Sequence, residues 1–206
     1  MYKRQVFSGT YNENIDLLGK ALIIGSEYLI SGDTSHISST IIDGQSNGSV
    51  INLADISGAQ IKLVGLTLQN GYAQFGGGIY SINSSPLLEN LIVTNNSSSE
   101  NGGGLYLHGG NPTLSSITID NNSAIAYGGA IYMQSNSSAI LNKLTIDNNS
   151  AENGAGIAMN SSNPTITNLR VSNNTADSTG GAISIYNNSN PGLYNLVIYN
   201  LSLIHI

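Results

Sequence analysis

Residues 102–127 read GGGLYLHGGNPTLSSITIDNNSAIAY, and residues 128–153 repeat the same plan as GGAIYMQSNSSAILNKLTIDNNSAEN. Each unit opens with a glycine-rich element and later reaches an apolar block that ends in Asn-Asn. The glycine element recurs at a constant interval, at Gly76, Gly102, Gly128, Gly154 and Gly180. Self-similarity at a fixed period of about 26 residues is the signature of a repeat architecture.

Within each unit the apolar residues alternate with polar ones, which is the period of a β-strand. At equivalent positions they fall into four columns: Ile79, Leu105, Ile131, Ile157 and Ile183; Leu88, Leu114, Leu141, Ile166 and Leu193; Leu91, Ile117, Leu144, Leu169 and Leu196; Val93, Ile119, Ile146, Val171 and Ile198. One unit alone cannot bury these residues, but stacked units turn each column into a continuous aliphatic ladder. The pattern therefore predicts an all-β fold, a right-handed single-stranded parallel β-helix (solenoid) with about 26 residues per coil, its coils ~4.8 Å apart.

The turns of the predicted solenoid carry their own signals. The pairs Asn95/Asn96, Asn121/Asn122, Asn148/Asn149 and Asn173/Asn174 fall at one turn, where stacked amides hydrogen-bond along a ladder and Asn tolerates a left-handed backbone. The glycine elements mark a corner that needs a positive φ or a close backbone approach. Residues 76–200 are the regular repeats. Residues 6–75, including Ile23 and Ile30, are predicted to form short strands of less regular N-terminal coils, because terminal repeats are usually atypical.

The two ends of the chain do not fit the repeat. Residues 1–5 (MYKRQ, with GTG read as the start codon) and 201–206 (LSLIHI) can be back-translated to DNA strings that are reverse complements over their overlap. We interpret both as residues encoded by a transposon adapter of a sequencing library, and the chain as a fragment of a longer gene. The alternative is coincidence in two short peptides. Such segments are excluded from fold reasoning.

The composition excludes several classes of protein. Asn, Ser and Gly make up 81 of the 206 residues, charged residues only 9%, and Cys and Trp are absent. A disulfide scaffold, a zinc-thiolate site and a helical bundle are therefore excluded. Six basic against twelve acidic residues argue against a nucleic-acid partner. Apolar runs such as Ala21–Ile24 are too short to form a membrane-spanning segment.

These motifs resemble known proteins. The GGAI-type element, followed by the Asn-Pro turn and the strand ending in Asn-Asn, is similar to the right-handed parallel β-helix repeats of bacterial surface proteins, including the chlamydial polymorphic outer-membrane proteins. The runs YLISGD at 28–33 and TIIDG at 40–44 resemble the opening coils of secreted β-helix proteins from Bacteroidetes-like bacteria. The resemblance covers about residues 11–200. It implies a bacterial protein of extracellular or outer cell-surface localisation, but no particular activity, since the fold carries lyases, hydrolases, adhesins and stalks.

Three tyrosines are the candidate ligand-binding residues. Tyr80, Tyr106 and Tyr132 each follow an inward aliphatic residue, so they point outward and stack on three neighbouring coils. Such a ladder could stack on sugar rings, because tyrosine combines an apolar face with a polar tip. The alternative is a cross-strand contact that only stabilises an exposed sheet.

Two carboxylates form the candidate metal site. Asp120 and Asp147 occupy equivalent outward positions on adjacent coils, where a hard cation such as Ca²⁺ would relieve their repulsion. The alternative is a solvated pair, because Ca²⁺ needs six to eight oxygens and the flanking coils supply Thr94 and Ser172 here. Arg170 is placed outward, opposite Thr145 and Thr118, with a surface ion pair to Asp147 as its expected contact.

The sequence assigns no catalytic residues and no cofactor beyond that possible Ca²⁺. It predicts a non-catalytic extracellular or cell-surface β-helix region, an adhesin-like or glycan-contacting scaffold whose partner is a polysaccharide or a host or neighbouring cell surface. One alternative is a polysaccharide lyase or glycoside hydrolase of the pectin-lyase-like fold, with its catalytic coils outside this fragment. The other is a passive structural stalk.

Overall fold

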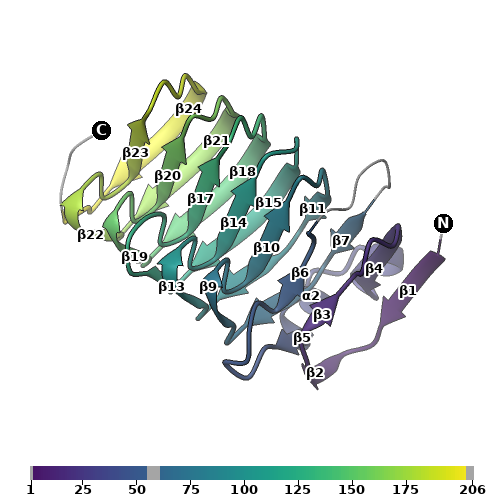
Figure 1. The fold of residues 1–206 in the computed structure, drawn as a ribbon. Helices are drawn as coiled ribbons and strands as arrows, with labels where there is room; N and C mark the ends of the chain where they lie inside the picture. The colour runs from purple at the N-terminus through teal and green to yellow at the C-terminus, as the bar shows by residue number, and fades with distance from the viewer. Residues whose placement is uncertain (1, 55–60, 203–206) are drawn as a thin grey trace.

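The computed structural model describes residues 2–54 and 61–202. The chain winds into a solenoid whose three sheets run along its length, with β1 at one end and β24 at the other (Figure 1). Neighbouring coils pair in parallel, and register partners such as Ile131 and Ile157 lie one repeat apart in the sequence. The prediction of an all-β parallel solenoid with about 26 residues per coil is confirmed.

Twelve of the described strands form the largest sheet: β1 (Tyr2–Val6), β2 (Gly9–Asn12), β4 (Leu22–Ser26), β5 (Thr40–Asp43), β7 (Lys62–Val64), β8 (Thr67–Gln69), β11 (Leu87–Glu89), β12 (Ile92–Thr94), β15 (Thr113–Asp120), β18 (Ile140–Asp147), β21 (Thr165–Ser172) and β24 (Gly192–Tyr199). A seven-stranded sheet contains β3 (Ile15–Asp16), β6 (Ile51–Asn52), β10 (Ile79–Ile82), β14 (Leu105–His108), β17 (Ile131–Gln134), β20 (Ile157–Asn160) and β23 (Ile183–Tyr186). A five-stranded sheet contains β9 (Tyr72–Phe75), β13 (Ser97–Asn101), β16 (Ser123–Ala124), β19 (Ser150–Asn153) and β22 (Thr175–Thr179).

The core is made of the four predicted aliphatic columns. Register pairs join their members from coil to coil, as Ile119 pairs with Ile146 and Ile146 with Val171. These side chains are essentially inaccessible to solvent in the middle coils. The columns therefore build one continuous apolar interior, which explains why the repeat keeps aliphatic residues at these positions while it varies the outward ones.

The Asn-Asn turns form the predicted ladder, and the two asparagines of each pair have separate roles. The first, such as Asn121, takes a left-handed backbone with φ 55° and faces solvent. The second, such as Asn122, is 1% exposed, and its Oδ1 accepts from the backbone N–H of Asn96 on the preceding coil at 3.0 Å. The same bond recurs from Asn122 to Asn149 and from Asn149 to Asn174. The ladder therefore locks successive turns together. Glycines of the next corner along the chain, such as Gly102 with φ 68°, take the predicted positive φ.

The strands of the largest sheet bend midway, a feature that the sequence did not reveal. In each coil from β7 onward one residue has a left-handed backbone there: Gly65, Asn90, Ser116, Lys143, Asn168 and Asn195. The bend allows the residues on both sides of it, such as Leu114 and Ile117, to face the interior. It also separates the outward surface of this sheet into two strips, of which the second carries Asp120 and Asp147.

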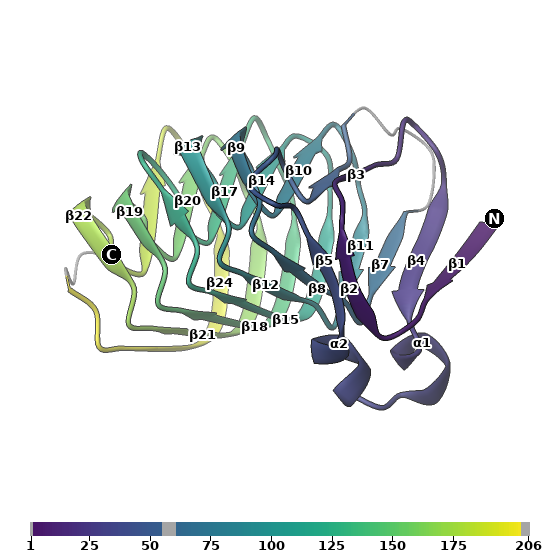
Figure 2. The same cartoon turned by 90° about the horizontal axis from the view of Figure 1, so that it is seen from below.

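The N-terminal region departs from the prediction at one place. Two short helices, α1 (Tyr28–Ser31) and α2 (Ser35–Ser39), lie between β4 and β5 and project from the solenoid near its N-terminal end (Figure 2). Ile30 lies in α1 and is 75% exposed, so its assignment to a short strand was wrong. Residues 2–6 form β1, which pairs with β4. Residues 203–206 lie outside the described part, and the adapter origin of both ends stays a prediction.

Candidate functional site

Tyr80, Tyr106 and Tyr132 lie in one column on the outward face of the seven-stranded sheet. The register pairs Tyr80 with Tyr106 and Tyr106 with Tyr132. The ring centroids are 5.6 Å and 5.7 Å apart, with interplanar angles of 13° and 23°. The rings therefore stack at the spacing that parallel strands impose.

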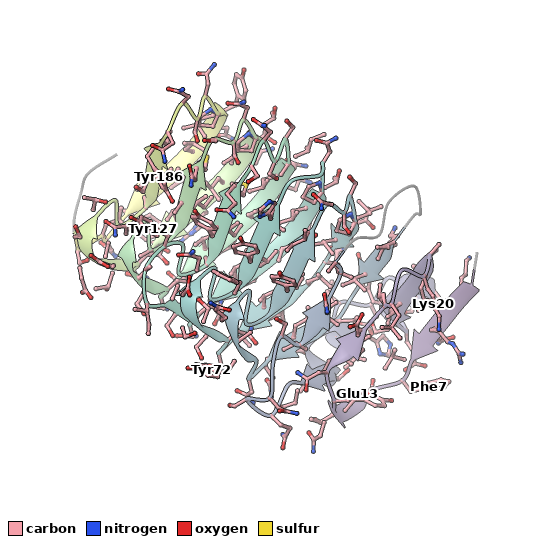
Figure 3. The ribbon with its side chains drawn as sticks, in the orientation of Figure 1. Phe7, Glu13, Lys20, Tyr72, Tyr127 and Tyr186 are labelled. Carbon is pink, nitrogen blue, oxygen red and sulfur yellow. The ribbon has the colours of Figure 1, made fainter. Side chains whose placement is uncertain are left out.

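Other aromatic residues cover most of this ladder. Tyr106 is only 4% and Tyr132 only 3% exposed. Phe75 lies 4.9 Å from Tyr106 between ring centroids, and Tyr127 lies 6.1 Å from Tyr132. Figure 3 labels Tyr127 and Tyr186, whose rings are 5.3 Å apart. An open three-ring platform is therefore absent at Tyr106 and Tyr132, and a ligand role for Tyr80, which is half-buried, stays a prediction.

Hydrogen bonds hold the phenol groups of this cluster together. Gln134 Nε2 donates to Tyr106 Oη at 2.6 Å, and Tyr132 Oη donates to Gln134 Oε1 at 3.0 Å. Burial, assisted by the neighbouring Tyr132, raises the pKa of Tyr106 to about 12. Burial and the hydrogen bond to Tyr132 likewise raise the pKa of Tyr186. Buried phenols joined by hydrogen bonds across coils indicate a stabilising contact between coils, which is the alternative role considered for the ladder.

An open groove lies on the largest sheet, on the second strip of its outward surface. The groove crosses β15, β18, β21 and β24 and encloses about 480 Å³. Its lining residues are polar or aromatic: Thr118, Asp120, Thr145, Asp147, Arg170, Ser172, Asn173 and Tyr199. It is thus the place where the structure brings together both predicted metal-site carboxylates.

The two carboxylates differ in their contacts. Asp147 Oδ1 accepts from Ser172 Oγ at 2.6 Å and from Asn173 Nδ2 at 2.8 Å, and its Oδ2 accepts from Asn148 Nδ2 at 2.6 Å. Asp120 Oδ2 accepts from Asn121 Nδ2 at 2.6 Å. Within residues 2–54 and 61–202 nothing donates to Asp120 Oδ1, so this oxygen is an available acceptor in the groove.

No group of three or more His, Cys, Asp or Glu side chains is close enough to hold a metal ion, as far as the described residues go. Asp120 and Asp147 are joined in register as predicted, but their further neighbours are hydroxyl and amide groups. Ca²⁺ at this pair stays a prediction.

Arg170 lies where the sequence placed it but makes a different contact. The register sets it beside Thr145, with Thr118 one coil further. Its guanidinium carbon lies 5.0 Å from the centre of the Tyr199 ring, and Nη2 donates to Tyr199 Oη. The prediction of an ion pair between Arg170 and Asp147 was therefore wrong. Sequence reasoning missed Tyr199, because the other regular coils place Asp, Ser or Thr at this position.

One arrangement superficially like a catalytic relay lies near the N-terminus. His36 Nδ1 is 3.4 Å from Ser8 Oγ and 3.6 Å from Glu27 Oε2. A Ser-His-acid relay needs the serine and the acid on different ring nitrogens. Both contacts use Nδ1, so this cluster does not have the geometry of a relay.

A solenoid of three parallel sheets with an internal asparagine ladder defines the protein as a parallel β-helix. The sequence model described as "Right handed beta helix region" matches residues 30–203, and the chain belongs to that family. The comparison with curated proteins finds no match, and the comparison with solved structures finds none either. Among the described residues, no helix has the length and apolar character needed to cross a membrane.

Proposed function

We propose that this chain is a non-catalytic β-helix scaffold that contacts glycans through the groove formed by β15, β18, β21 and β24. The observation that carries the proposal is the lining of that groove. Carboxylate, hydroxyl, amide and guanidinium groups and one aromatic ring lie side by side over four coils. This set offers both donors and acceptors to sugar hydroxyls.

The scaffold suits this role because its groove is built on rigid elements. Each lining side chain except that of Asn173, which lies in the turn after β21, stands on a parallel strand that is paired on one or both sides. A pre-ordered surface loses little conformational entropy when a ligand binds. An extracellular or outer cell-surface location, as an adhesin-like region, fits a polar surface of low charge with glycan partners.

The experiment is affinity electrophoresis of the protein through gels that contain different polysaccharides. We expect retardation by at least one polysaccharide and its loss in Thr145→Trp, which fills the middle of the groove. The matched control is Ser150→Trp, at an exposed position of the five-stranded sheet. Unchanged mobility in every gel would leave the chain a passive stalk.

A second candidate function is that of a scaffold for polysaccharide cleavage, as in the pectin-lyase-like enzymes. The register pairing of Asp120 with Asp147 is the observation that favours it, since glycosidases use two carboxylates. Release of reducing sugar from a retarding polysaccharide, abolished by Asp120→Asn, would support this function over binding alone.

A further inference from the structure

The shape of the groove constrains how a ligand lies in it. Its lining residues stand in two outward columns that run along the solenoid, Thr118–Thr145–Arg170 and Asp120–Asp147–Ser172–Tyr199. Within a strand the two columns are two residues apart, whereas along the axis they extend over four strands. At ~4.8 Å between strands and ~3.3 Å per residue, the groove is roughly 14 Å long and 7 Å wide. A narrow, extended ligand therefore fits along the solenoid axis and not across it.

The groove presents at least one polar group on each of its four coils. Threonine and aspartate recur together on β15 and β18, and Ser172 continues the aspartate column on β21. The coil spacing is close to the length of one sugar residue. A chain that presents hydroxyl groups at each residue would thus meet a carboxylate on each of the first two coils and a hydroxyl group on each of the next two.

The charges in the groove select among glycans. Asp120 and Asp147 supply two negative charges against the single positive charge of Arg170, and the whole chain carries a net charge of −6. Arg170 is also engaged with Tyr199, so an anionic group would have to compete for its guanidinium. A polyanion would bring its charges against both carboxylates, which is unfavourable at contact distance.

The carboxylates suit neutral hydroxyl groups instead. Asp120 Oδ1 accepts no hydrogen bond from the described residues, and a hydroxyl donating to a carboxylate forms a short, strong bond. Asn173 Nδ2 and Ser172 Oγ fix Asp147 in place, so its remaining lone pairs keep a constant direction.

From these observations we infer that the groove binds a neutral, extended glycan chain along the solenoid axis with about one sugar residue per coil, and that Asp120 is its main acceptor. This inference rests on the proposed function and names the class of glycan, its direction and its anchor.

Titration calorimetry on the whole chain tests it. The neutral probes are cello-, xylo- and manno-oligosaccharides of two, four and six residues, and the charged probe is hexagalacturonate. We expect at least one neutral series to bind, with affinity rising from two to four residues and then levelling off. Asp120→Asn should weaken that binding about tenfold or more, because a bond to a charged acceptor is lost. Asp177→Asn, at an exposed aspartate of the five-stranded sheet, should leave it unchanged.

The failures of the two proposals are distinguishable. Tighter binding of hexagalacturonate than of every neutral probe would overturn the inference on the ligand class while glycan contact stands. Affinity independent of chain length would overturn the axial direction, and an unaltered affinity in Asp120→Asn would overturn the anchor. If no probe binds the chain and no polysaccharide retards it, both proposals fail.

Discussion

The asparagine ladder offers the sharpest test of what holds the coils together. The side chain of Asn122 makes five hydrogen bonds. Its Nδ2 donates to Val93 O at 2.9 Å, Asp120 O at 3.0 Å and Asn149 Oδ1 at 3.0 Å. Its Oδ1 accepts from Asn96 N at 3.0 Å and from Asn96 Nδ2 at 3.1 Å. The perturbation is Asn122→Ala, which removes all five.

The magnitude follows from which partners are left unpaired. The backbone N–H of Asn96 loses its acceptor in a buried site, which costs about 1–3 kcal/mol. The other partners keep one bond or are backbone carbonyls with a second lone pair, so their losses are smaller, about 0.5 kcal/mol each. We expect Asn122→Ala to lower the free energy of unfolding by about 3–5 kcal/mol.

Asn121→Ala is the matched control, because it makes the same chemical change one residue earlier. Asn121 is exposed and left-handed, so its replacement loses one surface hydrogen bond and places alanine at φ 55°. That costs about 1 kcal/mol. The assay is urea unfolding followed by circular dichroism, with midpoint and slope compared between variants. Equal losses for the two variants would refute the separate roles assigned to the pair.

Three further changes test other parts of the fold. The backbone of Lys143 is left-handed, with φ 56°, and the equivalent residue of the next coil is Asn168. Asparagine tolerates this conformation better than lysine, so Lys143→Asn should raise the free energy of unfolding in urea by about 0.5 kcal/mol. A decrease in that free energy would contradict the strain assigned to this bend. Burial raises the pKa of Tyr106 to about 12 from the ordinary 10, so the folded state holds a proton that the unfolded chain releases. The contribution of this phenol to stability is therefore complete below pH 10 and is lost as pH rises through about 12. Titration of the tyrosines by phenolate absorbance should show one fewer late-titrating group in Tyr106→Phe than in the unaltered chain. Identical titration curves would argue against a raised pKa at Tyr106. A Cβ on Gly103 would lie 2.3 Å from Ser123 O, so Gly103→Ala should cost about 2–3 kcal/mol in the same urea assay, and an unchanged midpoint would show that the corner can relax.

The parts of the fold that the sequence predicted are those set by the period alone. A repeat of constant length places equivalent residues in register, so the aliphatic columns, the asparagine ladder and the Tyr106 stack follow from counting. The aromatic residues that cover the tyrosine stack cannot be found by counting the repeat. Phe75 and Tyr127 precede the glycine corner in alternate coils, and only the path of the chain around that corner brings them onto the neighbouring rings. The contact between Arg170 and Tyr199 was missed for a related reason, because the last coil breaks the pattern that the others share.

The arrangement of the solenoid separates the residues that stabilise it from those that line its groove. Inward columns tolerate little change, because each member packs against the same column above and below it. Outward positions are free to differ from coil to coil, and one column shows this directly: Thr94, Asp120, Asp147, Ser172 and Tyr199 follow one another in register. A change of one outward residue alters the groove at a single coil and leaves the core intact. A ligand that lies along the axis of such a surface would therefore meet its outward side chains in a fixed order. An extended glycan chain has the shape to make contacts in that order.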